Sequence, residues 1–420
     1  MKKRTIESRN LFSSLASTMV LTSLMFISCG RGDDGISGIK EDFAYESHLD
    51  MGEMGGDGPD GYSDPSVNPN GNTSAGTVTA GEWNDLNNWP FWSALMTSED
   101  FAEKSDYWKF YTNNRVAVLV TDDKGEPLPG VIVELLRQSE DSKPIWTAVT
   151  DNHGEANCWL GAFQKDQADA DRLTISLDGL VMAEHPVVST WDEQGETAVN
   201  KYVAPKASPK ADRADIAFIV DATGSMQDEI DFLKSDMVDI IGKAGSMNPS
   251  LTLRTAALFY RDEGDEYLTR HSAFTQDLKE TARYVDQQQA GGGGDYPEAV
   301  HSALEHMLQD LAWDSQARNR LAFLILDAPA HHTNNVIESL QESVRLCAVK
   351  GIRLIPVAAS GVDKNTEFML RFFATFTGGT YVFLTNDSGV GYDHIAASVG
   401  KYDVEQLNEL LIRLIAYYTE

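Results

Sequence analysis

The sequence predicts a multidomain chain: an α/β doubly wound, Rossmann-like domain at the C-terminal end, and a smaller all-β sandwich before it. Two observations support this prediction. From about residue 213 onward, apolar runs of strand length alternate with amphipathic stretches of helical periodicity. Between residues 113 and 203, short alternating runs are separated by Gly, Asp and Pro turns. A length of 420 residues is enough for two or three domains.

The first 28 residues predict export. A basic start at residues 2–4 and an apolar run at 11–27 have the layout of a secretory signal peptide. The run ends in Ile-Ser-Cys29-Gly, which resembles the lipobox of bacterial lipoproteins. The resemblance implies cleavage before Cys29 and lipidation of its thiol, which would anchor the protein in the bacterial cell envelope, at the outer membrane, facing the periplasm or the outside. An ordinary signal peptide that happens to contain a cysteine is the alternative.

Two segments of contrasting composition follow. Residues 29–80 are predicted to be a flexible acidic tether, because 31–80 hold ten acidic and two basic residues and hardly any periodic apolar pattern. Residues 81–112 are rich in Trp, Phe and Tyr. We interpret this aromatic segment as a packing motif that docks onto the next domain. A binding platform for carbohydrate or protein is the alternative.

Residues 113–203 are predicted to form the all-β sandwich. Val116, Val118 and Val120 alternate with other residues before an Asp/Gly turn, and strand-turn-strand patterns recur further on. The motifs Gly-x-Pro-Leu-Pro-Gly-Val-x-Val and Thr-Asp-x-x-Gly resemble those of the carboxypeptidase regulatory-like and transthyretin-like β-sandwich family. The resemblance implies an accessory module without catalysis. Residues 204–212 form a predicted Pro/Ala/Lys/Ser linker.

Residues 213–420 alternate between apolar runs of strand length and amphipathic stretches of helical periodicity. Strand-like runs lie at 216–220, 251–260, 321–326, 353–359 and 380–384, and helical patterns lie at 226–246, 276–289, 297–312, 334–350, 365–376 and near 407–418. Such alternation predicts an open, largely parallel sheet that is covered by helices on both faces.

Three polar clusters fall where these strands end or helices begin. Asp221, Thr223 and Ser225 follow the first strand, Asp295 follows four glycines, and Asp327 ends a later strand. Open α/β sheets bind ligands beyond the carboxyl ends of their strands, and carboxylate and hydroxyl oxygens suit a hard divalent cation. The sequence therefore predicts a site for Mg²⁺, with Ca²⁺ or Mn²⁺ as alternatives. A helix cap would explain one residue of the first cluster but not the coincidence of three clusters.

These residues resemble the metal-ion-dependent adhesion site of the von Willebrand factor type A domain, and the resemblance covers residues 213–420. The family pattern is Asp-x-Ser-x-Ser after the first strand, a Thr in a second loop and an Asp after a later strand. Asp221, Thr223 and Ser225 match the first motif, and Asp327 matches the last Asp. The Thr position falls on Asp295, which departs from the pattern.

The resemblance implies that hydroxyls coordinate the ion directly and that a partner's carboxylate completes its shell. Because a carboxylate at Asp295 adds negative charge, we expect it to strengthen metal binding and to weaken the demand for an acidic group on the partner.

Other chemistries receive less support. His331 and His332 suggest a zinc hydrolase, yet no convincing further His/Cys set accompanies them. Gly291 to Gly294 are not followed by the Lys-Ser/Thr of a phosphate-binding loop. The net charge of −30 argues against nucleic acid, whose binding needs clustered Lys and Arg.

The sequence thus predicts a secreted, lipid-anchored binding protein without enzymatic turnover. The expected partner is a protein or an extracellular-matrix component held through the divalent ion, with an acidic side chain as the candidate contact. Contact with a membrane is expected through the lipid anchor only. Two other functions stay open: a hydrolase that uses the ion as a Lewis acid, and an envelope assembly scaffold in which the ion is structural.

Overall fold

The computed structural model describes residues 75–420, apart from 113, 138–142, 166–171, 190–196, 205–210, 248–249, 392 and 420. The described residues all belong to one compact unit of the chain. The predicted signal peptide with Cys29, nearly all of the predicted tether and most of the predicted linker lie outside the described residues. None of the described helices is long and apolar enough to cross a membrane.

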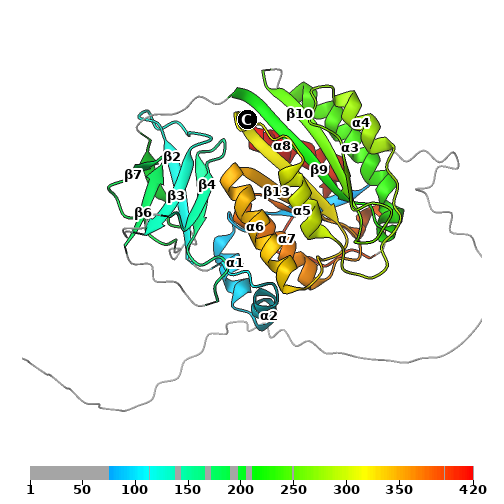
Figure 1. Cartoon of the computed structure of the whole chain (residues 1–420), viewed down its shortest axis with the longest axis horizontal. Helices are drawn as coiled ribbons and strands as arrows, with labels where there is room; N and C mark the ends of the chain where they lie inside the picture. Colours follow the sequence, from blue (N-terminus) through cyan, green and yellow to red (C-terminus); the bar gives the residue numbers. More distant parts are fainter. Residues whose placement is uncertain are drawn as a thin grey trace, which may run out of the picture. The chain divides into compact units, whose positions relative to one another are not determined.

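An eight-stranded mixed sheet forms the centre of the C-terminal domain, in the order β11-β10-β9-β12-β13-β14-β1-β15 (Figure 1). Its parallel strands are β9 (Ala211–Asp221), β10 (Thr252–Tyr260), β12 (Ala317–Leu326), β13 (Ile352–Ala358) and β14 (Tyr381–Leu384). Antiparallel pairing adds β11 (Thr269–His271) at one edge and β1 (Thr79–Trp83) with β15 (Glu405–Gln406) at the other. The parallel strands are nearly continuous apolar runs, because both of their faces are buried.

Helices cover both faces of this sheet (Figure 1). One face packs on α3 (Gln227–Met247), α4 (Leu278–Asp286) and α8 (Leu407–Thr419), and the other packs on α5 (Val300–Gln309), α6 (Asn334–Lys350) and α7 (Lys364–Thr377). Within β9, Ile216 and Phe218 join the first core and Ala217 and Ile219 join the second. Residues alternate between faces because successive strand side chains point in opposite directions. The C-terminal domain is therefore Rossmann-like, as predicted.

Two smaller sheets lie between residues 115 and 203. One has the order β5 (Glu155–Trp159), β2 (Arg115–Thr121), β8 (Asn200–Val203), and the other has the order β4 (Trp146–Val149), β3 (Ile132–Arg137), β6 (Leu173–Leu177), β7 (Leu180–Val181). Val116, Val118 and Val120 are buried, as their alternation predicts. They belong to the same apolar cluster as the α5, α6 and α7 face of the large sheet.

The aromatic segment packs against this cluster through two short helices, α1 (Trp89–Met96) and α2 (Glu99–Trp108). Trp92 is fully buried and its ring contacts Phe368 and Phe372 of α7, with centroids 6.5 and 6.1 Å away. Trp89 contacts Trp159 of β5, at 5.8 Å. Trp and Phe side chains supply large buried areas, so this segment joins the large α/β domain to the smaller sheets.

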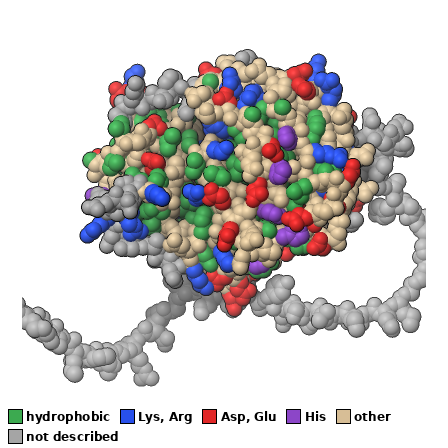
Figure 2. All heavy atoms as spheres, in the orientation of Figure 1, with side chains coloured by type: hydrophobic (Ala, Val, Ile, Leu, Met, Phe, Trp, Pro, Cys, Tyr) green, Lys and Arg blue, Asp and Glu red, His purple; other side chains and the backbone are tan. Residues whose placement is uncertain are grey.

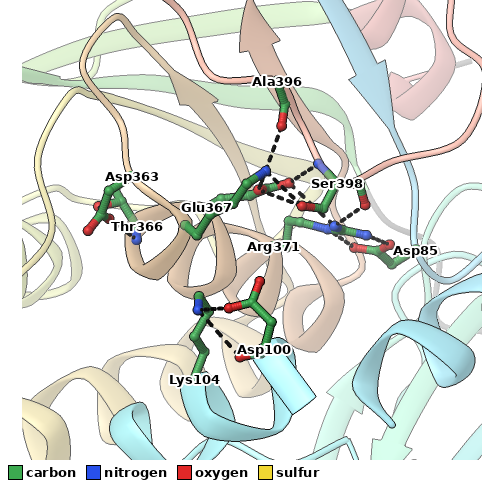
Figure 3. Close-up of polar contacts among 10 residues, drawn as sticks. Asp85, Asp100, Lys104, Asp363, Thr366, Glu367, Arg371, Ala396 and Ser398 are labelled. Atoms are coloured by element: carbon green, nitrogen blue, oxygen red, sulfur yellow. Dashed lines mark hydrogen bonds and ion pairs between the residues drawn. The ribbon is translucent and has the colours of Figure 1, made fainter. Parts of the chain in front are cut away.

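Charged groups reinforce the same junction. Arg371 of α7 is fully buried and donates two hydrogen bonds to Asp85, at 2.9 and 2.5 Å (Figure 3). Its third contact is the carbonyl oxygen of Ser398, at 2.7 Å, and Glu367 accepts a hydrogen bond from the Ser398 backbone, at 2.6 Å. Buried charges persist only when they are paired and hydrogen-bonded in this way.

Candidate metal centre

The carboxyl ends of the parallel strands meet at one edge of the large sheet. Asp221 is the last residue of β9 and lies in register with Tyr260, the last residue of β10. Asp327 directly follows β12, which pairs with β9 up to Ile325 and Val220. Because neighbouring parallel strands end at the same edge, the first and last of the predicted metal ligands lie at this edge.

The loop after β9 turns its polar atoms inward. Asp221 Oδ1 accepts hydrogen bonds from the backbone nitrogen of Thr223, at 2.9 Å, and from its hydroxyl, at 2.7 Å. The hydroxyl oxygens of Thr223 and Ser225 are 3.2 Å apart. Thr223 holds the N-cap position of the short helix η1 (Gly224–Met226), yet its side chain makes no capping hydrogen bond. Helix capping therefore does not account for this hydroxyl.

A third buried carboxylate, which the sequence analysis did not assign to the site, is Glu298. It is 3% exposed, and its backbone nitrogen donates to Pro329 O at 2.9 Å, so its loop runs beside the loop after Asp327. Gly293, at φ +72°, comes very close to it. A Cβ at Gly293 would lie 2.9 Å from Glu298 Oε1 and 3.3 Å from Thr223 Cβ. Glycine suits this position because it tolerates both the positive φ and the close approach.

Several buried oxygen atoms at this edge have no hydrogen-bond partner among the described residues. Within the described residues, Asp221 Oδ2, Asp327 Oδ1, Glu298 Oε2 and the Tyr260 hydroxyl are all of this kind. Leaving a polar atom buried and unpaired is costly. The sequence offered a hint of Glu298, since it lies three residues after Asp295 in the same polar cluster.

The pKa values of Asp221, Asp327 and Glu298 are all raised. Burial, followed by the Asp327 carboxylate, raises the pKa of Asp221, and burial raises the pKa of Asp327. Burial, followed by the charges of Asp221 and other carboxylates, raises the pKa of Glu298 to about 9. Carboxylates that repel one another inside a protein favour a proton or a cation between them.

Asp295, unlike these buried carboxyls, lies at the surface. It is exposed, and no hydrogen bond or ion pair among the described residues joins it to Asp221, Asp327 or Glu298. The next residue, Tyr296, ties this loop to the start of α7, because its hydroxyl donates to Gly361 O and accepts from the backbone nitrogen of Asp363, both at 3.2 Å. The structure thus brings Asp221, Thr223, Ser225 and Asp327 together and leaves Asp295 at the surface.

The donor atoms of this edge suit a hard cation. In the part of the chain that the structure describes, no three His, Cys, Asp or Glu side chains are placed to hold a metal ion by themselves. A cation here would therefore depend on the hydroxyls of Thr223 and Ser225 and on water between the ion and the carboxylates. Mg²⁺ takes oxygen ligands and usually keeps several of its waters, so this donor set fits it.

A comparison with known families covers the same part of the chain. A family defined as the von Willebrand factor A domain matches residues 215–352, which include Asp221, Thr223, Ser225, Asp295 and Asp327. Residues 215–352 match the von Willebrand factor A domain. Domains of this family generally take part in protein–protein interaction and adhesion.

Two curated relatives match part of the chain. An alpha-protein kinase of Dictyostelium discoideum, vwkA, is 32% identical over 165 residues, which are 39% of this chain and 26% of the kinase. An ariadne-like RING finger protein of Acanthamoeba polyphaga mimivirus is 25% identical over 186 residues, 40% of this chain and 18% of that protein. The chain thus spans about a quarter or less of the length of these relatives.

Among solved structures, proximal thread matrix protein 1 from the mussel byssus is similar to this chain. The two are 17% identical, with a TM-score of 0.30 and 39% of each chain covered.

An acidic loop borders the candidate site of the von Willebrand factor A domain. Asp265 Oδ2 accepts hydrogen bonds from the backbone nitrogens of Gly293, at 2.8 Å, and Asp262, at 3.2 Å. These contacts hold the loop after β10 against the glycine-rich loop. The structure places this loop beside Glu298, whose pKa Asp262 and Asp265 help to raise.

The two histidines after Asp327 point to different neighbours. His331 Nε2 is hydrogen-bonded to Asp262 Oδ1 at 2.7 Å, whereas His332 stacks on Tyr107 of α2, with ring centroids 3.5 Å apart. A cleft of about 630 Å³ opens beside His331, and its lining includes Glu263, His301 and Glu305. Figure 2 shows acidic and histidine side chains close together on the face of the molecule that it presents.

Proposed function

We propose that this protein binds a protein or extracellular-matrix partner through a divalent cation at the edge of its von Willebrand factor A domain, without turning over a substrate. One observation carries this proposal: beside the hydroxyls of Thr223 and Ser225, buried carboxylate oxygens of Asp221 and Asp327 have no hydrogen-bond partner among the described residues. A divalent ion such as Mg²⁺, Mn²⁺ or Ca²⁺ would satisfy these oxygens and present an open ligand position to a partner.

The proposal extends to the rest of the chain. Cys29 is the proposed lipid attachment, which would place the binding domain at the bacterial cell envelope. The two small sheets are the proposed accessory β-sandwich of the carboxypeptidase regulatory-like type. The zinc hydrolase gains no support from His331 and His332, which contact Asp262 and Tyr107.

The experiment is a capture assay on the full chain, in Mg²⁺ and in EDTA. We expect a set of proteins from an envelope or matrix extract to be retained only with Mg²⁺, and to be lost with Asp221→Ala, because that change removes both a carboxylate and the anchor of the Thr223 hydroxyl. Glu342→Ala is the matched control, because Glu342 is a half-exposed carboxylate on α6 that pairs with Arg345. Retention that is equal in EDTA, by a folded protein, contradicts the proposal.

The same protein samples distinguish binding of a partner through the ion from a scaffold in which the ion is only structural. Thermal unfolding with and without Mg²⁺ reports whether the ion stabilises the fold. A metal that raises the melting temperature but leaves capture unchanged assigns the ion to the structure alone.

A further inference from the structure

Glu298 lies deeper than its position in the sequence suggests. It precedes α5, and its backbone both donates to Pro329 and bridges Ala330 in a parallel pair. These contacts fix the residue against the loop that carries Asp327. A residue at the start of a helix normally directs its carboxylate to solvent, yet the side chain of Glu298 is turned inward and buried.

The Glu298 carboxylate contributes an unpaired oxygen to the candidate metal centre. Its Oε2 atom is buried without a partner in the described part of the chain, and its Oε1 atom lies where a Cβ on Gly293 would contact it, next to Thr223. It is near enough to Asp221 and Asp327 for their charges to act on it. Asp295, the residue that the family pattern places in this loop, is exposed and has neither feature.

We infer that Glu298, and not Asp295, is the third carboxylate of the ion site, and that it makes the loaded site favour a neutral oxygen of the partner over a carboxylate. The inference rests on the proposed function. Because no three acidic side chains among the residues that the structure describes are placed to hold a metal by themselves, Glu298 acts on the ion through its charge and through water.

The preference for a neutral ligand follows from the charge of the site. Asp221, Asp327 and Glu298 together carry three negative charges, and a divalent ion neutralises two of them. An adhesion site with two carboxylates would be neutral once loaded and would attract a third carboxylate from a partner. Here that third carboxylate is part of the chain, and Asp262 and Asp265 add further negative charge nearby. A hydroxyl or amide carbonyl oxygen of the partner meets no such repulsion.

Calorimetric titration of the full chain with Mn²⁺ at pH 8 tests the assignment. Glu298→Gln keeps the shape of the side chain and removes its charge, and we expect it to weaken Mn²⁺ binding at least about tenfold. Asp295→Asn removes a charge from an exposed position, where water and salt screen it, and we expect a change below about twofold. Equal affinities for Glu298→Gln and wild type, or a larger loss for Asp295→Asn, overturn the inference and leave the proposed ion site intact. A wild-type chain that binds no Mn²⁺ overturns both.

Acetate is the probe for the preference between ligands. Each Mn²⁺-loaded protein is titrated with acetate, and the water-proton relaxation rate reports when acetate displaces water from the ion. We expect Glu298→Gln to bind acetate several-fold more tightly than wild type, because the loaded variant has lost the excess negative charge. Tighter binding of acetate by wild type overturns the proposed preference. The melting temperature of the metal-free Glu298→Gln protein shows that it is folded.

Discussion

Replacing Arg371 by leucine is expected to lower the free energy of unfolding by about 3–5 kcal/mol, because it leaves the buried Asp85 carboxylate without its counter-charge. Arg371 and Glu367 are fully buried and Asp85 is 4% exposed. Burial raises the pKa of Asp85, and the Arg371 guanidinium opposes that rise. Without the arginine, Asp85 loses two hydrogen bonds and its counter-charge at once. Urea unfolding followed by tryptophan fluorescence measures the loss.

Two comparisons make this result interpretable. Lys104→Ala removes an ion pair with the exposed Asp100, drawn in Figure 3, and such pairs contribute about 0–1 kcal/mol. The double variant Arg371→Leu/Asp85→Leu should recover part of the loss, because a buried ion pair replaced by apolar side chains often costs little. A loss below about 1 kcal/mol for Arg371→Leu, similar to that for Lys104→Ala, would mean that the buried pair contributes little to this junction.

Local pattern was enough to predict most of the α/β domain. The helix predicted at 226–246 is α3, Gln227–Met247, and the helix predicted at 334–350 is α6, Asn334–Lys350. These elements have long amphipathic repeats, and a Thr N-cap and a left-handed glycine C-cap bound α6. The helix predicted at 297–312 is shorter in the structure, where α5 spans Val300–Gln309. It begins later than predicted because Glu298 is held in a bridge to Ala330.

The strand β1 could not be predicted from local pattern. The prediction assigned its residues to the end of the tether and the start of the aromatic segment. In the structure, Ala80 pairs with Leu384 and Thr79 pairs with Gln406. A strand of five residues, with partners about 300 positions away in the chain, has no turn or repeat nearby to reveal it. The α/β domain therefore takes one strand from a segment far outside the predicted boundaries 213–420.

The candidate site shows the same limit. Asp221 and Asp327 end apolar strands, so the rule for strand ends was enough to place them at one edge. Asp295 was chosen by its place in a family pattern, which fixes the loop but not the direction of each side chain. The positive φ values of Gly292 and Gly293 turn the loop, and Glu298 rather than Asp295 faces inward. These φ values could not be predicted from the sequence, because glycine adopts both positive and negative φ readily.

Without metal, the protein is expected to become less stable as the pH rises from about 7 to about 9. The pKa of Glu298 is raised from 4.5 to about 9 in the folded protein, so the folded state binds more protons than the unfolded state across this window, and its stability falls as the pH rises. The raised pKa values of Asp221 and Asp327 act in the same direction. His301, whose pKa burial lowers, titrates below this window and does not oppose the trend.

Thermal unfolding at several pH values, in EDTA and in Mg²⁺, measures this effect. We expect the melting temperature in EDTA to fall by several degrees between pH 7 and pH 9, and we expect Mg²⁺ to raise it most at pH 9, where the carboxylates no longer hold protons that the ion must displace. Burial is the main cause that raises the pKa of Asp236 to about 6, so this residue also makes the folded protein more stable at lower pH. Mg²⁺ at the sheet edge does not change the contribution of Asp236. The difference between the Mg²⁺ and EDTA curves therefore isolates the site, and Glu298→Gln should flatten that difference. A stabilisation by Mg²⁺ that is the same at pH 7 and pH 9 would show that protons and the ion do not compete for these carboxylates.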